Sequence, residues 1–250
     1  MSRTPLLIPA VSLALAAGAV HAEPGLGDKV YAPSVEQGVT EFETRGGTLV
    51  GRGAGGGSGA VFELEHGFSD RVSAAVVGEW EREPGKQSKL DAIGVETVIH
   101  LGVLRGLGID TGLYLEYEQR LHAESGKGEA RLLFARTKGR FEGLLNLTAT
   151  KALTDKSGQG GGAYGYAAQA TWKTAPGLRL GLEAFGNLGA GRSPGSAQAH
   201  YVGPTVVWES KPRWLPVGLE LQTSYLFAAG AAQRYADGEA RVQLSFERQF

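Results

Sequence analysis

Apolar and polar residues alternate with a period of two along most of the chain after residue 37. In the stretch 109–118 the odd positions are mostly apolar, whereas the even positions include Asp110, Glu116 and Glu118. The same alternation recurs from Leu178 and again from Val217. A period of two is typical of β-strands whose two faces meet different surroundings. The pattern therefore predicts a chain built of strands.

The repeated alternation predicts about twelve strands, each about long enough to cross a bilayer when tilted. Pro204 makes one of them irregular, because proline cannot donate to a ladder and needs a bulge or an end position. An even number of strands returns the chain to the side on which it began. The strands are expected near residues 38–46, 60–68, 71–82, 89–101, 108–120, 128–136, 139–151, 163–173, 178–188, 200–209, 217–227 and 239–250.

The chemistry of the two faces distinguishes a soluble β-sandwich from a membrane barrel. In a sandwich the apolar face is the core, whereas in a transmembrane barrel it meets lipid and the polar face lies inside. Here the polar faces carry glutamate on nearly every predicted strand, with arginine on several, which suits a lumen of ion pairs. We therefore predict an all-β transmembrane antiparallel up-and-down barrel.

The predicted connections alternate in length, as they do in outer-membrane barrels. Long connections, rich in small residues, are expected at 46–59, 83–88, 121–127, 152–162, 189–199 and 228–238. Shorter connections are expected at 69–70, 102–107, 137–138, 174–177 and 210–216. With periplasmic termini the long connections face the outside of the cell.

The N-terminus predicts a cleaved signal peptide. Arg3 precedes an apolar run that ends at Val20-His21-Ala22, which has the small-x-small pattern of a cleavage site. The run is at the short end for a bilayer span and contains Pro9 and Gly18, so a helical anchor is disfavoured. The expected organisation is a signal peptide at 1–22, a periplasmic segment at 23–37 and a barrel at 38–250.

Composition narrows the possible functions. The absence of cysteine excludes disulfides, thiolate metal sites and thiol nucleophiles. A formal net charge of −1, spread along the chain, argues against nucleic acid as a partner. The 39 glycines and 10 prolines, without a collagen-like period, favour turns and kinked strands.

The last residues, 240–250, form an amphipathic strand that ends in an aromatic residue. Val242, Leu244, Phe246 and Phe250 share one face. The segment resembles the C-terminal signal of bacterial outer-membrane proteins, which implies recognition by the barrel assembly machinery. Through stretches such as Lys29 to Pro33 and Glu63 to Arg71, the chain also resembles uncharacterised proteobacterial outer-membrane barrels, which implies outer-membrane lipids as surroundings and no particular activity.

The preferred function is a small channel for small polar solutes, since charged rings set the preference of a pore. No separate plug domain is evident, and no cofactor or metal-ligand cluster is expected. The residues expected to face the lumen are Glu79, Glu96, Glu116, Glu118, Glu129, Glu142, Glu183, Glu220, Arg131, Arg140, Arg179 and Arg241.

Two other functions remain open. The first is an outer-membrane lipid hydrolase or acyl-modifying enzyme, with His122 or His200 and Ser125 or Ser193 as candidates, although no familiar spacing supports it. The second is a structural or adhesive barrel with functional outer loops. Gly51 to Gly56 matches G-x-G-x-x-G, but without a following helix it predicts a loop. The Asn146-Leu147-Thr148 sequon falls within a strand and predicts no function.

Overall fold

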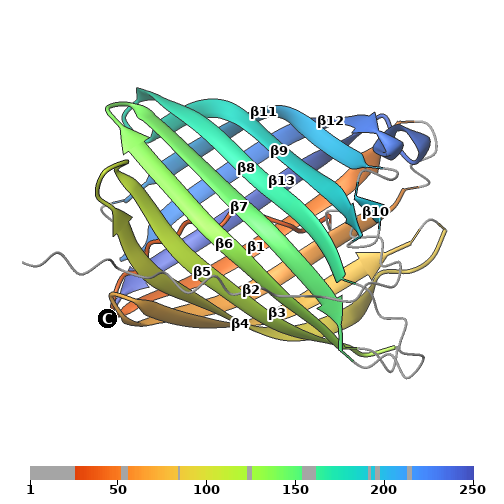
Figure 1. The fold of residues 1–250 in the computed structure, drawn as a ribbon, viewed down its shortest axis with the longest axis horizontal. Helices are drawn as coiled ribbons and strands as arrows, with labels where there is room; N and C mark the ends of the chain where they lie inside the picture. Colours follow the sequence, from red (N-terminus) through yellow and green to blue (C-terminus); the bar gives the residue numbers. More distant parts are fainter. Residues whose placement is uncertain are drawn as a thin grey trace, which may run out of the picture.

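Twelve long antiparallel strands close into one barrel in the computed structural model, as the alternation predicts (Figure 1). The structure describes residues 26–51, 56–83, 85–122, 126–153, 162–190, 193–194, 198–212 and 216–250. The long strands are β1 (Val39–Val50), β2 (Ser58–Ser69), β3 (Val72–Arg82), β4 (Lys89–Leu104), β5 (Ile109–Arg120), β6 (Gly126–Lys138), β7 (Phe141–Ala152), β8 (Gly162–Ala175), β9 (Leu178–Ala190), β11 (Ala199–Ser210), β12 (Gly218–Gly230) and β13 (Gly238–Gln249).

Two short elements lie near the end of the barrel that carries the longer connections. The two-residue strand β10 (Ser193–Pro194) pairs with β9, and the 3-10 helix η1 (Ala231–Arg234) follows β12. Neither interrupts the ring, which β1 and β13 close between Val39↔Gln249 and Val50↔Gly238. Within the described residues no helix is long and apolar enough to cross a membrane.

The two faces of the strands point as predicted. Leu64, Val76 and Leu182 are 49%, 57% and 58% exposed on the outer surface. Their sequence neighbours Glu63 and Glu183 are each 2% exposed and point inward. Burial of carboxylates beside exposed aliphatic side chains is the reverse of a soluble protein and is the arrangement of a barrel that faces lipid.

The two ends of the barrel differ. The turn end holds the start of β1, the end of β13 and short connections such as Asp70–Arg71 and Gly139–Arg140. The opposite end, called the loop end here, holds most of the longer connections, although the seven-residue connection between β11 and β12 lies at the turn end. The loop predicted from Gly46 to Gly59 was too long, because β1 continues to Val50 and β2 begins at Ser58. Gly46, Gly47 and Gly59 belong to the strands.

Pro204 lies inside β11 rather than at its end. Pairing of β11 with β12 lacks Gly203 and Pro204, whereas pairing with β9 continues through Pro204↔Leu182. The missing rungs reflect the missing N–H donor of proline.

Residues 26–38, called the lumen segment here, precede β1 and run inside the ring of strands (Figure 1). The segment contains no strand or helix. It starts near the loop-end half of β1, where Gly47 approaches Leu26, and reaches the turn end at Gly38, whose N–H donates to the Gly67 carbonyl oxygen. The sequence pattern predicts a periplasmic segment at 23–37 and gives no sign of an element inside the barrel.

Candidate functional site

The lumen segment is fixed to the barrel wall by an amide side chain that mimics a backbone rung. The Tyr31 N–H donates to Asn146 Oδ1 at 2.7 Å, and Asn146 Nδ2 donates to the Tyr31 carbonyl oxygen at 2.9 Å. Asn146 points inward from β7 and is fully buried. Pairing both backbone groups of a buried residue avoids the cost of leaving them without partners.

Three arginines of the wall bind the beginning of the lumen segment. Arg131 Nη1 lies 2.8 Å from Asp28 Oδ1, and Arg241 Nη1 donates to the Asp28 carbonyl oxygen at 2.9 Å. Arg45 Nε donates to the Gly27 carbonyl oxygen. These arginines come from β6, β13 and β1, so the segment is held from different sides of the barrel.

Lys29 occupies a small carboxylate site. Its Nζ lies 2.9 Å from Glu43 Oε1 and 3.1 Å from Glu63 Oε1, on the neighbouring strands β1 and β2. Arg45 pairs with both carboxylates as well. Gln243 donates to Glu43 Oε2 at 2.6 Å. Both carboxylates are 2% exposed, so this is a buried site in which two negative and two positive groups balance.

Apolar contacts complete the docking of the lumen segment. The Tyr31 ring lies 4.4 Å from the Tyr114 ring, and Val98 and Leu133 belong to the same buried cluster. On the other side, Val30 packs against a cluster that includes Phe185 of β9. The lumen segment therefore contacts the wall in opposite directions and spans the lumen.

Glycines on the inner face make room for the lumen segment. A Cβ at Gly112 would lie 2.9 Å from Pro33 Cβ. A Cβ at Gly47 would overlap the Leu26 carbonyl oxygen, and one at Gly67 would overlap the Glu36 carbonyl oxygen. These strand glycines allow close approach of a second backbone.

A cavity of about 780 Å³ lies between the lumen segment and the loop end. Asp28 and Tyr31 line it from the segment, and Arg82, Asp91 and Arg120 line it at strand ends on the loop side. Among the described residues that line it, ten are acidic and five are lysine or arginine. This excess of carboxylates gives the cavity a negative potential, which attracts cations.

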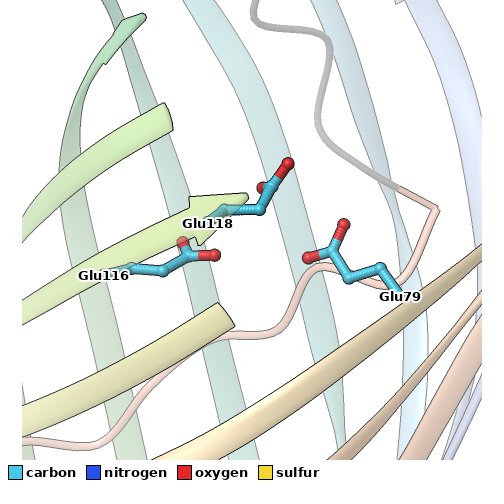
Figure 2. A group of neighbouring side chains, drawn as sticks. All are labelled: Glu79, Glu116 and Glu118. Atoms are coloured by element: carbon cyan, nitrogen blue, oxygen red, sulfur yellow. The ribbon is translucent and has the colours of Figure 1, made fainter. Parts of the chain in front are cut away.

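Three carboxylates converge in this cavity. Glu79 of β3 and Glu116 and Glu118 of β5 point toward one another, with one oxygen from each within 4.8 Å of the others (Figure 2). Lys127 pairs with Glu118 and lies 3.9 Å from Glu116. Because a lysine already neutralises part of the cluster, we assign it to the charged wall and not to a metal.

A second ionic network lies on the inner face toward the turn end. Arg179 lies 3.1 Å from Glu142, 2.8 Å from Glu209 and 3.3 Å from Glu220. Nearby, Gln169 donates to Glu183 at 3.1 Å. These groups come from β7, β8, β9, β11 and β12. Within the described residues none of them makes a hydrogen bond or ion pair with the lumen segment.

The structure places eleven of the twelve predicted lumen residues on the inner face of a strand. Arg140 differs, because it lies in the exposed turn between β6 and β7. Those on the inner face are Glu79, Glu96, Glu116, Glu118, Glu129, Glu142, Glu183, Glu220, Arg131, Arg179 and Arg241.

The residues considered for hydrolysis are not brought together in the described part of the chain. His122 lies after β5 and bonds the Leu90 carbonyl oxygen at 3.0 Å. His200, on β11, bonds the Tyr166 hydroxyl at 3.1 Å. Ser125 and the side chain of Ser193 lie outside the described residues. Within the described residues neither histidine is hydrogen-bonded to a serine.

Sequence reasoning missed the residues that hold the lumen segment, namely Asp28, Lys29, Tyr31, Glu43, Glu63 and Asn146. Alternation could have placed Glu43 and Glu63 on the inner face, since each is two residues from another charged residue on its strand. Nothing in the local pattern indicates that residues 26–38 return into the barrel.

No protein-family model and no curated protein matches this chain. Solved structures do match in fold. An outer-membrane channel from Pseudomonas putida F1 aligns with a TM-score of 0.54 and 11% identity over 91% of this chain and 99% of that one. The NanC porin aligns with a TM-score of 0.54 and 8% identity over 84% of this chain and 100% of that one. The KdgM porin aligns with a TM-score of 0.51 and 8% identity over 84% of this chain and 99% of that one.

The fold and the inner face together define a class, the outer-membrane β-barrel with a charged lumen. These identities are too low to carry more than the fold. In this chain an N-terminal segment lies across the lumen.

Proposed function

We propose that this protein is an outer-membrane channel for small polar solutes that prefers cations. The supporting observation is the 780 Å³ cavity inside a closed barrel, whose described lining has twice as many acidic as basic residues. A pore lined by carboxylates lowers the energy of a cation relative to an anion. The porin fold of the matching structures is consistent with this function.

The protein would lie in the outer membrane and be inserted there by the barrel assembly machinery. The apolar outer face, including Leu64 and Val76, would meet outer-membrane lipids. The start of β1 and the end of β13 both lie at the turn end. We assign this end to the periplasm because short turns face that side in this class. The signal peptide at 1–22 and recognition of Val242, Leu244, Phe246 and Phe250 by the barrel assembly machinery complete the proposed export route.

Planar-bilayer recording of the purified full chain tests the function. Discrete conductance steps are expected, and in a KCl gradient the reversal potential should have the sign of a potassium-permeable pore. The variant Glu79→Gln should lower the ratio of potassium to chloride permeability, because Glu79 lines the cavity. Asp70→Asn is the matched control, since it removes the same charge from the exposed turn between β2 and β3. A folded sample that never conducts, or that prefers chloride, would refute the proposal.

A further inference from the structure

Resting on the proposed channel function, we propose that the lumen segment is a tethered plug whose Lys29 occupies a binding site for primary ammonium groups. Small organic cations that carry such a group compete with Lys29 for Glu43 and Glu63, and the segment then leaves the lumen. The lumen segment is thus the element that limits passage, and primary ammonium compounds are the class of solute.

The position of the lumen segment makes it the barrier. It forms one boundary of the cavity at the loop end and continues from there to the turn end. Tyr31 bonds β7 through Asn146, and its hydroxyl lies 3.1 Å from Glu96 of β4. Pro33 is fully buried against Gly112 of β5. A solute that crosses the barrel must pass these contacts, so displacement of the segment opens the path.

Individual side-chain contacts, which a competing group can replace, hold the segment in the lumen. The segment shares no strand ladder with the wall, and its bonds run mostly to charged or amide side chains. Breaking a buried ion pair is costly while the remaining charge has no partner, so release of the segment requires another cation to take the place of Lys29. Gly38, with φ of 77°, links the segment to β1 and provides a point at which the backbone can turn. Once the predicted cleavage after Ala22 has occurred, the segment is tethered only there.

The site of Lys29 defines the ligand. With Lys29 in place, Glu43 and Glu63 are balanced by Lys29 and Arg45. When Lys29 departs, one negative charge remains unbalanced among buried groups, which is costly unless another cation enters. The ammonium is received by one oxygen from each carboxylate, at 2.9 Å and 3.1 Å. A primary ammonium from solution can reproduce both contacts.

A reversible crosslink tests the plug in the full chain. Because the chain has no cysteine, Gly27→Cys with Val61→Cys of β2 provides a single pair whose Cβ atoms would lie 3.4 Å apart, close to the separation found in disulfides. Oxidation should form the disulfide, detected by mass, and should abolish full openings in bilayer recordings. Reduction should restore them. Failure of the disulfide to form, or full openings with the disulfide intact, would overturn the plug.

Titration with propylammonium tests the ligand class. It should raise the opening frequency of the wild-type channel to a plateau, whereas equal concentrations of sodium chloride or n-propanol should not. Lys29→Gln should open about tenfold more often without any added amine, as the loss of one charged contact predicts. In Lys29→Gln the response to propylammonium should be lost.

Two carboxylate variants separate the site from general electrostatics. Glu63→Gln should abolish the response to propylammonium, because it removes one of the two ammonium acceptors. Glu142→Gln is the matched control: it also removes a carboxylate from the inner face, but its partner is Arg179, so the response should remain. An equal response to sodium chloride, or loss of the response in both variants, would overturn the ammonium site.

The outcomes distinguish this inference from the proposed function. If the wild type never conducts, the channel function itself is refuted. If the wild type conducts and neither the disulfide nor Lys29→Gln changes its openings, the channel stands and the plug is refuted.

Discussion

At the scale of single residues, the inward amide of Asn146 holds the backbone of the lumen segment directly. Asn146 bonds both backbone groups of Tyr31, so it fixes the depth and the orientation of the lumen segment. A carboxylate could accept from the Tyr31 N–H but could not also donate to its carbonyl oxygen when ionised. The requirement for a donor and an acceptor explains an uncharged residue at this position.

The variant Asn146→Leu should loosen the lumen segment. Without the amide, the Tyr31 N–H and carbonyl oxygen lose their partners, at a cost of about 1–3 kcal/mol. The rate at which a water-soluble maleimide modifies a single cysteine in Pro33→Cys should therefore rise, because Pro33 is fully buried when the segment is docked.

Gln169→Leu is the control for this measurement. Gln169 is also a buried inward amide, but it bonds Glu183 and Gln222 and not the lumen segment. Equal modification rates in the two variants would mean that Asn146 does not hold the segment in place.

At the scale of elements, alternation within each strand sets its orientation. On β3, Val72 and Val76 are exposed on the outer face, whereas Ser73 and Val77 are buried on the inner face. Every strand position thus belongs either to the lipid side or to the lumen side. The wall tolerates inward charge because the charges pair with one another, and it tolerates outward apolar groups because they meet lipid.

Arginine substitutions on β3 should report the depth of each position in the bilayer. Val76→Arg, near the middle of the strand, should destabilise the folded barrel by about 2–4 kcal/mol, whereas Val72→Arg, at its end, should cost about 0–1 kcal/mol. Denaturant titration of the protein folded in lipid vesicles measures both. Equal costs at the two positions would contradict the assignment of the outer face of β3 to lipid.

At the scale of the whole molecule, the barrel and the lumen segment are two parts with different determinants. The barrel closes through pairing of neighbouring strands and of β1 with β13. The lumen segment instead depends on groups brought from distant strands, such as Arg131 and Arg241, which both bind Asp28. The lumen segment begins three residues after the predicted signal peptide, so cleavage of that peptide decides where the mature chain begins relative to the segment.

Protein purified from outer membranes should begin at Glu23. Cleavage after Ala22 leaves three residues before Leu26, so the free N-terminus would lie close to the start of the lumen segment. Intact-mass measurement and N-terminal sequencing check this. A mature chain that retains residues 1–22 would refute the predicted signal peptide and the single tether.

The sequence alone determined the strands and their faces. The period of two is local, so it could be followed from Val39 to Gln249, and it predicted the inner face of the strands, on which Glu79 and Glu183 lie. Glycines misled the prediction between Gly46 and Gly59, since a glycine in a turn and a glycine that admits a second backbone look the same in a sequence. Arg140 was misplaced because turn boundaries shift easily by a residue or two.

Only the tertiary structure decided where residues 26–38 lie. Their position depends on contacts across more than a hundred residues, such as Tyr31 with Asn146, and such contacts leave no periodic trace. Lys29 reads as an ordinary charged residue until the closed barrel brings Glu43 and Glu63 to it. Local alternation thus specifies the wall, and the closure of the wall specifies what the lumen holds.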